Sequence, residues 1–442
     1  MAMDKQAEYV LSTVEERGIR FVRLWFTDVL GFLKSVAITP AELEDVMEDG
    51  MSFDGSSIDG FSRVQEADMI AKPDPTTFQL LPWRPDEGGV ARMFCDIVTP
   101  AGDPFDGDPR GALKRNLSRL SERGYTLDVA PELEFYYFTN AGPDREVLDR
   151  GGYFDLTPLD VAQEYRRRSI VVLEQLGIPV ESSHHEQSPG QHEIDLRASD
   201  ALSMADQLLT ARLAIKEVAM ENGMYATFMP KPLQDAAGSA MHLHLSLFEG
   251  EVNAFHEPSD GLSKVGEAFI AGLLTHAREL TAITNQWVNS YKRLHGGFEA
   301  PTFVTWAHNN ESALVRVPTL QPGKPERTRI EYRSPDPACN PYLAFSAIVA
   351  AGLAGIERGY ELAPEVMENV AVTDGDAPGL TGIDRLPSGL DEALDALEES
   401  ELMKEALGEH IVEWFLKNKR DEWRRYRRHV SLFEIEENLP IL

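Results

Sequence analysis

Two glutamates stand two positions apart in a stretch with the composition of a β-strand. In "PELEFYYF", residues 131–138, Glu132 and Glu134 interrupt a run of Leu, Phe and Tyr. Side chains alternate across a strand, so both carboxylates project from one face, close enough to repel. Such a pair requires a neutralising partner, and a divalent cation is one. For this stretch alone a solvated strand face is the plain alternative, because 73 of the 442 residues are acidic.

Three further segments carry polar side chains in similar patterns. In "ESSHHEQSPGQHEIDLR", residues 181–197, a Ser-Pro-Gly turn can fold two glutamates toward each other. In "GSAMHLHLSLF" and "RIEYRSPD" the polar residues alternate with apolar ones, so they share one face of a strand. The residues concerned are Glu181, Glu186 and Glu193; His242, His244 and Ser246; and Arg329, Glu331 and Arg333. A strand with one wet face explains each segment alone, but not the joint selection of glutamates with a metal-competent histidine.

The residue types indicate the chemistry. Carboxylates with one imidazole are hard ligands suited to Mg²⁺ or Mn²⁺, and the thiolates that zinc or copper would favour are absent from the pattern. Paired cations beside arginines serve phosphoryl transfer, whose transition state spreads negative charge over phosphate oxygens. Arginines are present as Arg293, Arg316, Arg329 and Arg333. The pattern therefore favours a phosphoryl-transferring metal enzyme.

The whole chain narrows the class further. Its length of 442 residues suffices for two domains, and its hydrophobic fraction of 43% is ordinary for a globular protein. The net charge of −31 repels nucleic acids and anionic membranes, which argues against both as partners. No apolar stretch is long enough to span a bilayer, and the first residues lack the pattern of an export signal. With only Cys95 and Cys339 and no disulfide framework, we expect a cytoplasmic protein.

The elements that must position these residues form a mixed α+β pattern. A helix ended by Gly18, two strands over 19–38 around a turn at Gly31, and a helix from Pro40 to about Glu48 open the chain. A long functional loop follows from residue 51, with strands near 79–82 and 91–97. Further on we expect helices at 109–123, 158–176, 199–222, 262–286, 340–358 and 388–417, and strands at 125–138, 178–186, 225–229 and 240–248. The linker-like "TPAGDPFDGDPRGA" places a domain boundary near residue 105, dividing the chain into 1–105 and 106–442.

No regular βαβ alternation, GxGxxG or GxxxxGK[ST] is present, so neither a Rossmann fold nor a P-loop is supported. Instead, ten stretches resemble one family in order and approximate spacing. They are "FDGSSI", "PELEF", "HHE" with "PGQHEI", "FMPKP", "MHLHLSL", "NQWVNSYKRL", "FEAP", "SALVRVP" and "RIEYRSPDPACNPYL". Over essentially the whole chain they are similar to bacterial type I glutamine synthetase.

The resemblance implies a small N-terminal β-grasp domain and a large catalytic domain of the glutamine-synthetase and guanidino-kinase type. It also implies a dodecamer of two hexameric rings, with each active site between neighbouring subunits. ATP would be a substrate, with two or more Mg²⁺ or Mn²⁺ ions per subunit. The reaction would join ammonia to the γ-carboxylate of L-glutamate through γ-glutamyl phosphate, with a flap that keeps water from the intermediate.

The resemblance also assigns roles by position. Glu134, Glu186 and Glu193 resemble the ligands of one metal ion, and Glu132, His242 and Glu331 those of the ion at the ATP phosphates. Glu181, His244, Ser246 and Arg329 fall where the family contacts the nucleotide, and Gly238, Arg293 and Arg333 where it holds glutamate. Arg316 falls at the phosphates, Asp54 with Asp68 at the ammonium site of the next subunit, and Glu299 on the flap.

Three positions depart from the family pattern. Glu311 stands where an arginine is usual near the transferred phosphate, Ala237 where an asparagine is common, and Ala198 where an aromatic residue meets the nucleotide. A unit-charge contact at ~4 Å and an effective dielectric of ~20 is worth roughly 4 kcal/mol, so Glu311 bears on catalysis. Two alternatives therefore stay open: a γ-glutamyl ligase with an organic amine or polyamine as acceptor, and a catalytically weak ring paralogue. Asp54 and Glu299 favour ammonium.

Two features of the sequence predict how the activity is regulated: a missing tyrosine and the position of one arginine. No tyrosine occurs between Tyr360 and Tyr426, where adenylylated relatives carry the modified residue. The chain thus resembles the non-adenylylated branch. In that branch an arginine just after "FDGSSI" assists feedback inhibition by glutamine, and Arg63 stands at that place.

Overall fold

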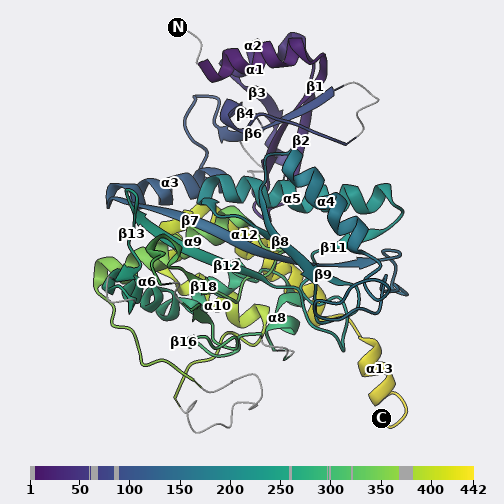
Figure 1. The fold of residues 1–442 in the computed structure, drawn as a ribbon, viewed down its shortest axis with the longest axis vertical. Coiled ribbons are helices and arrows are strands. Elements are labelled where there is room, and N and C mark those ends of the chain that lie inside the picture. Colours follow the sequence, from purple (N-terminus) through teal and green to yellow (C-terminus); the bar gives the residue numbers. More distant parts are fainter. Residues whose placement is uncertain are drawn as a thin grey trace.

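A computed structural model describes residues 5–58, 60, 68–83, 89–257, 261–295, 297, 300–319, 322–367 and 382–442. The first elements gather at one end of the molecule (Figure 1). They are α1 Lys5–Glu16, β1 Ile19–Thr27, β2 Leu33–Ile38, α2 Leu43–Asp49, β3 Met51–Asp54, β4 Asp68–Pro73, β5 Gln79–Leu80 and β6 Gly89–Val98. Their sheet has the order β2-β1-β6-β4-β3, with β5 also paired to β6. Only the β1–β6 pair within this described sheet is parallel.

A larger sheet dominates the rest of the chain, with the order β16-β17-β18-β12-β7-β9-β8. The strands of this order are β7 Tyr125–Phe138, β8 Val180–His185, β9 Gln191–Leu196, β12 Met241–Glu249, β16 Trp306–His308, β17 Val315–Val317 and β18 Ile330–Tyr332. Short strands β10 Ser199–Asp200, β11 Tyr225–Thr227 and β13 Val252–Asn253 extend it, and β14 His256–Glu257 pairs with β15 Gly261–Leu262. This sheet brings segments from across the chain into one surface.

Helices form the second layer. They are α3 Pro109–Glu122, α4 Gln163–Gln175, α5 Ala201–Glu221, α6 Lys264–Thr275, α7 Ala277–Thr284, α8 Val288–Leu294, α9 Pro341–Arg358, α10 Leu390–Glu399, α11 Glu401–Leu407, α12 Glu409–Arg427 and α13 Leu432–Asn438. Helix α9 is buried almost throughout and packs against α3, α5 and α6. Helices α6 and α9 approach closely because a Cβ at Gly272 would lie 2.1 Å from the Ala351 carbonyl oxygen.

The mixed α+β class is confirmed, and several element predictions need correction. The expected loop after residue 51 contains strands β3 and β4, which pair with each other. The helix expected at 262–286 is two helices with a break at His276, whose φ and ψ are −101° and 10°. The helix expected at 388–417 is three, α10 to α12, and α12 continues to Arg427.

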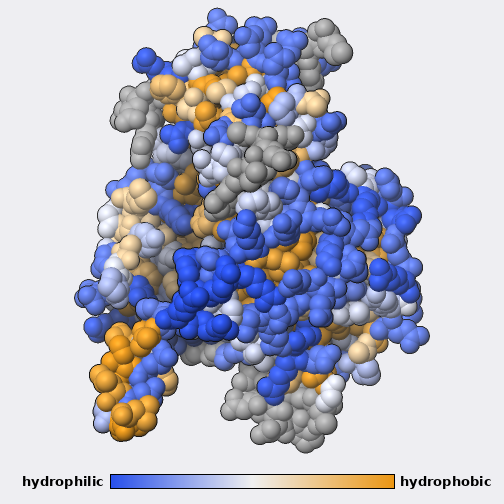
Figure 2. All heavy atoms as spheres, turned by 180° about the vertical axis from the view of Figure 1, so that it is seen from behind, coloured by the Kyte–Doolittle hydropathy of each residue, from blue (hydrophilic) through white to orange (hydrophobic). Residues whose placement is uncertain are grey.

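The surface seen from behind is mostly hydrophilic, and α13 forms a projecting apolar segment (Figure 2). Leu432 and Phe433 in this helix are 74% and 71% exposed. Within the described residues, we find no helix with the length and apolarity needed to cross a bilayer.

Candidate active site

A cavity of about 520 Å³ opens along one face of the larger sheet. It is lined by all six predicted metal ligands, together with Gly238, Arg293, Arg316 and Arg333. The lining also includes Glu311 and Ala237, two of the positions that depart from the family pattern. A slightly larger cavity of about 570 Å³, lined by described residues such as Phe228 and Trp287, is mostly apolar and contains none of the predicted site residues. The carboxylate-lined cavity is therefore the candidate site.

Three adjacent strands supply one cluster of metal-competent side chains. Glu132 on β7 pairs in register with His242 on β12, and His244 pairs with Glu331 on β18. One ligand atom each of Glu132, His242 and Glu331 lies within 4.8 Å of the others. The Glu132 carboxylate accepts hydrogen bonds from His242 Nδ1 at 2.9 Å and His244 Nε2 at 2.7 Å. The strand register thus brings together residues about 200 positions apart in the sequence.

Two arginines pair with a carboxylate of this cluster. Arg316 Nη1 lies 2.5 Å from Glu331 Oε2, and Arg333 pairs with the other oxygen of the same carboxylate. Burial opposes ionisation of Glu331, but Arg333 outweighs it and lowers the pKa of Glu331. Burial likewise opposes ionisation of Glu132, and the hydrogen bonds from His242 and His244 lower the pKa of Glu132. Both carboxylates are therefore held in the anionic form that binds cations.

In the second predicted set, buried carboxylates repel one another. Glu134 on β7 lies opposite Glu193 on β9, and its carboxylate accepts from Gln191 Nε2 at 2.8 Å and Ala240 N at 2.9 Å. Burial, and then the charge of Glu186, raise the pKa of Glu134 to about 8. Burial, and then Glu134, raise the pKa of Glu193 well above its ordinary value. A divalent cation would remove this cost, so the residues present fit such an ion.

The structure adds residues that the sequence reasoning missed. Ligand atoms of His184, Glu193 and Asp195 lie within 4.8 Å of one another, so this grouping differs from the predicted set of Glu134, Glu186 and Glu193. His184 Nε2 lies 2.7 Å from Glu186 Oε1. His184 and Asp195 have the same two-residue spacing to Glu186 and Glu193 that marked Glu132 and Glu134, so the strand period alone could have found them. Tyr153 and Phe154, whose rings stack 4.2 Å apart, also line the cavity.

Two residues predicted to hold glutamate lie against each other at the cavity wall. A Cβ at Gly238 would lie 2.7 Å from Arg293 Cγ, so only glycine leaves room for that side chain. The Arg293 guanidinium donates to the Ser334 carbonyl at 2.6 Å and the Arg333 carbonyl at 3.0 Å. These bonds fix the guanidinium within the protein.

Other predicted residues lie apart from this cavity. The residues Glu181, Ser246 and Arg329 are outside its described lining, and Ser246 Oγ donates to the Thr328 carbonyl at 3.0 Å. Asp54 and Asp68 face each other across β3 and β4 and are exposed, also outside the lining. Ala198 is exposed as well. Arg63 and Glu299 fall outside the described residues.

The fold and the cavity define an enzyme whose site is built for divalent cations and anionic substrates. Family models of the glutamine synthetase β-grasp domain and catalytic domain match residues 18–100 and 106–438. The chain belongs to the glutamine synthetase family, whose members use ATP and divalent metal ions.

Individual relatives match this chain over nearly the whole of their own length. A glutamine synthetase of Mycolicibacterium smegmatis is 55% identical, with 99% of this chain and 100% of the relative covered. One of Thermotoga maritima is 46% identical over 98% of this chain and 99% of its own. A solved structure titled "Apo GmaS without ligand" is 32% identical, with a TM-score of 0.87 over 97% of this chain and 99% of that one.

Proposed function

We propose that the enzyme joins ammonia to the γ-carboxylate of L-glutamate with ATP, giving L-glutamine, ADP and phosphate. The observation that carries this proposal is the single cavity in which six carboxylate and imidazole ligands meet Arg316 and Arg333. The family membership and the relatives named glutamine synthetase support it. Activation of the carboxylate by phosphorylation is needed because direct ligation with ammonia is unfavourable in water.

The acidic residues of the cavity and its arginines would bind different partners. Glu134, Glu186 and Glu193 would hold one Mg²⁺ or Mn²⁺ ion, and Glu132, His242 and Glu331 a second. When bound, such ions neutralise charge on the ATP phosphates during transfer. Arg316 would contact the phosphates, while Gly238, Arg293 and Arg333 would hold glutamate. Glu181, His244, Ser246 and Arg329 would contact the nucleotide, and Glu299 would close the site over the intermediate.

An acceptor panel tests the reaction. Phosphate release that depends on ATP and glutamate is measured with ammonium, hydroxylamine and a series of organic amines. We expect release with ammonium at concentrations that leave the larger amines inactive. Release only with an organic amine would assign the enzyme as a γ-glutamyl ligase of amines. No release with any acceptor would contradict ligase activity altogether.

We propose further that each active site is shared between neighbouring subunits of a dodecamer. Asp54 and Asp68 are exposed on the first sheet and outside the cavity of their own chain, so they are free to meet the site of another. The apolar side chains exposed on α13, among them Leu432 and Phe433, also favour coverage by a further copy. In this arrangement residues 1–105 form the domain that reaches the neighbour, and residues 106–442 the catalytic domain.

Regulation would follow the non-adenylylated branch. The chain offers no tyrosine between Tyr360 and Tyr426 as an acceptor for AMP. Arg63 would assist feedback inhibition by glutamine, so Arg63→Ala should weaken that inhibition more than it changes turnover. A cytoplasmic location stays a prediction from the low cysteine content.

A further inference from the structure

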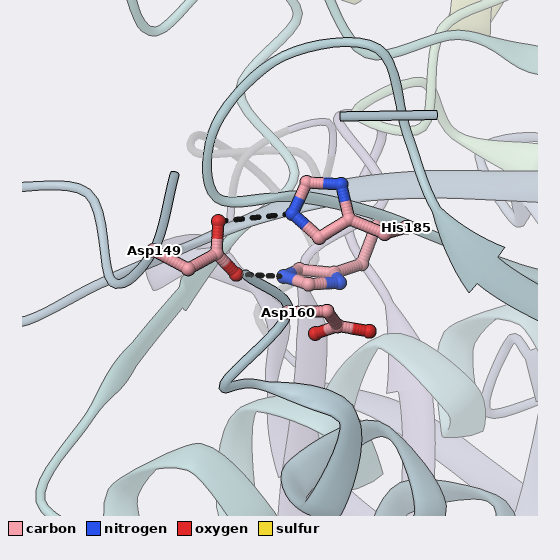
Figure 3. Close-up of side chains that lie close together, drawn as sticks. Asp149, Asp160 and His185 are labelled. Atoms are coloured by element: carbon pink, nitrogen blue, oxygen red, sulfur yellow. Dashed lines mark hydrogen bonds and ion pairs between the residues drawn. The ribbon is translucent and has the colours of Figure 1, made fainter. Parts of the chain in front are cut away.

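A buried polar cluster lies behind the β8–β9 hairpin, on the side opposite the cavity. His185 and His192 pair in register across the hairpin, and Asp149, Asp160 and Arg166 surround them. Each of the five residues is at most 6% exposed. Figure 3 shows Asp149 reaching the His185 ring and a second imidazole, with Asp160 beside them. We call these five residues the hairpin latch.

The latch is joined to the backbone of the hairpin. Asp149 Oδ1 accepts from Gly190 N at 2.8 Å, in the hairpin turn, and from His185 Nε2 at 2.9 Å. His185 Nδ1 donates to the Glu186 carbonyl at 2.7 Å. These contacts hold the backbone on both sides of the turn that separates Glu186 from Glu193. Strand alternation then directs Glu193 to the cavity while its neighbour His192 faces the latch.

Hydrogen-bond roles show that the latch is not itself a metal site, although four of its residues have ligand atoms within 4.8 Å of one another. Arg166 Nη1 lies 2.8 Å from His192 Nδ1, and a guanidinium can only donate. His192 Nδ1 therefore accepts, and its Nε2 carries the hydrogen and cannot bind a cation.

The rest of the latch has equally fixed roles. Arg166 Nη2 donates to Asp160 Oδ2 at 2.9 Å, which ties helix α4 to the loop before it. Both nitrogens of His185 face acceptors, so its ring carries both hydrogens. Alternating donors and acceptors thus connect the hairpin rigidly to α4.

We propose that the hairpin latch sets the positions of Glu186 and Glu193, and through them the affinity of the active site for divalent cations. Asp149 is the central positioning residue, since it contacts the hairpin turn and one strand at once. The inference rests on the proposed role of Glu186 and Glu193 as metal ligands. Residues that orient ligands typically change metal affinity by about 10- to 100-fold when they are replaced.

The test is direct titration of the metal-free, full-length enzyme with Mn²⁺, in which unbound Mn²⁺ is measured by electron paramagnetic resonance. Asp149→Ala should weaken binding to one class of site by about tenfold or more. Asp149→Asn keeps an oxygen for Gly190 N and His185, so it should recover most of the affinity. It also covers the case in which Asp149→Ala does not fold.

A matched control separates positioning from general destabilisation. Asn116 is 2% exposed and its side chain donates to the carbonyls of Ala112 in α3 and Ala406 in α11, neither of which belongs to the hairpin. Asn116→Ala should lower the melting temperature without changing the Mn²⁺ affinity. Unchanged affinity in Asp149→Ala, or an equal loss in Asn116→Ala, would overturn the proposal.

Two further measurements distinguish the possible failures. Glu186→Gln should itself weaken Mn²⁺ binding, and if it does not, the proposed ligand set is wrong rather than the latch. Elemental analysis after exhaustive chelation should give the same metal content for the wild type and Asp149→Ala. A tightly held equivalent present only in the wild type would show that the latch is a metal site, against our assignment of hydrogens.

Discussion

Burial, and then the charge of Glu186, raise the pKa of Glu134 to about 8, so the negative charge of Glu134 is costly without a compensating cation. His242 faces Glu132 and Glu331 in the neighbouring cluster. We predict that Glu134→Ala or His242→Ala lowers turnover by about 100-fold or more, because each leaves the remaining ligands of an ion uncompensated. Phosphate release at saturating Mg²⁺ measures the loss, and size-exclusion chromatography checks assembly. Near-normal activity of either variant in millimolar Mg²⁺ would refute the ligand assignment.

Glu311 is the departure with the greatest electrostatic reach. It lines the cavity, but its side chain is exposed, so solvent screens its charge and the full contact energy does not apply. Burial works against the charge of Arg316, yet Glu331, and to a lesser extent Glu311, raise the pKa of that guanidinium. The negative charge of Glu311 is thus already partly offset by the positive charge of Arg316.

We therefore expect Glu311→Gln to lower the KM for ATP by less than about tenfold, equivalent to about 1.4 kcal/mol, and to leave the enzyme active. Removing a carboxylate near bound phosphates reduces repulsion, which fixes the sign of the change. Glu326→Gln, at an exposed carboxylate outside the described cavity lining, is the control and should leave this KM unchanged. Loss of turnover in Glu311→Gln would mean that Glu311 has a positive role in the reaction.

At the scale of elements, helix α3 begins at a buried carboxylate. Asp108 Oδ1 accepts from Arg110 N at 3.0 Å, and Oδ2 accepts from Ile97 N at 3.1 Å, so one side chain caps the helix and joins it to β6. Burial raises the pKa of Asp108 from 3.8 to about 6. The folded state therefore holds this proton more tightly than the unfolded chain, and the associated stability is lost as the pH rises from about 4 through 6.

The shift corresponds to roughly 3 kcal/mol between the two protonation states. We predict that the free energy of unfolding of Asp108→Asn rises by about that amount relative to the wild type between pH 4 and pH 7. The amide stays neutral, whereas the carboxylate becomes charged in a buried position. Denaturation midpoints of both proteins across this pH range measure the difference. A difference that does not depend on pH would contradict the buried-carboxyl assignment.

The elements also show what sequence patterns can and cannot predict. Strand periodicity predicted that Glu132 and Glu134 share one face of their strand, and that His242 shares a face with His244 and Ser246, since both follow from the backbone alone. Strands β3 and β4 were not predicted, because residues such as Gly and Asp are uncommon in strands. These short strands form because they pair with each other within the sheet. The latch was missed because Asp149 and His192 meet only through the folded hairpin. Local pattern thus predicts which way a side chain points, while tertiary contacts decide what it meets.

At the scale of the whole molecule, control by covalent adenylylation requires an acceptor phenol that the chain does not carry between Tyr360 and Tyr426. We predict that incubation with an adenylyltransferase and ATP adds no AMP. Intact-mass spectrometry measures this, with an adenylylated relative as the positive control. A stoichiometric adduct in residues 361–425 would place the enzyme outside the non-adenylylated branch.

Sharing of active sites between subunits predicts that certain inactive variants restore activity when they are coexpressed. Asp54 is exposed on the first sheet, whereas Glu134 and His242 lie in the cavity of the larger one. If a complete site combines Asp54 of one subunit with Glu134 of its neighbour, then Asp54→Ala and Glu134→Ala are each inactive alone and complement each other when coexpressed. Random mixing in equal amounts should restore about a quarter of the sites, because such head-to-tail interfaces pair each subunit with one neighbour on either side.

The control is coexpression of Glu134→Ala with His242→Ala, which removes one residue from the same cavity in every subunit. That mixture should stay inactive, since no subunit in it carries a complete set of metal ligands. Phosphate release per assembled complex, with the subunit ratio taken from mass spectrometry, measures both mixtures. Recovery in the first mixture and none in the second is what a shared site requires. Equal inactivity of the two mixtures would mean that Asp54 acts within its own chain.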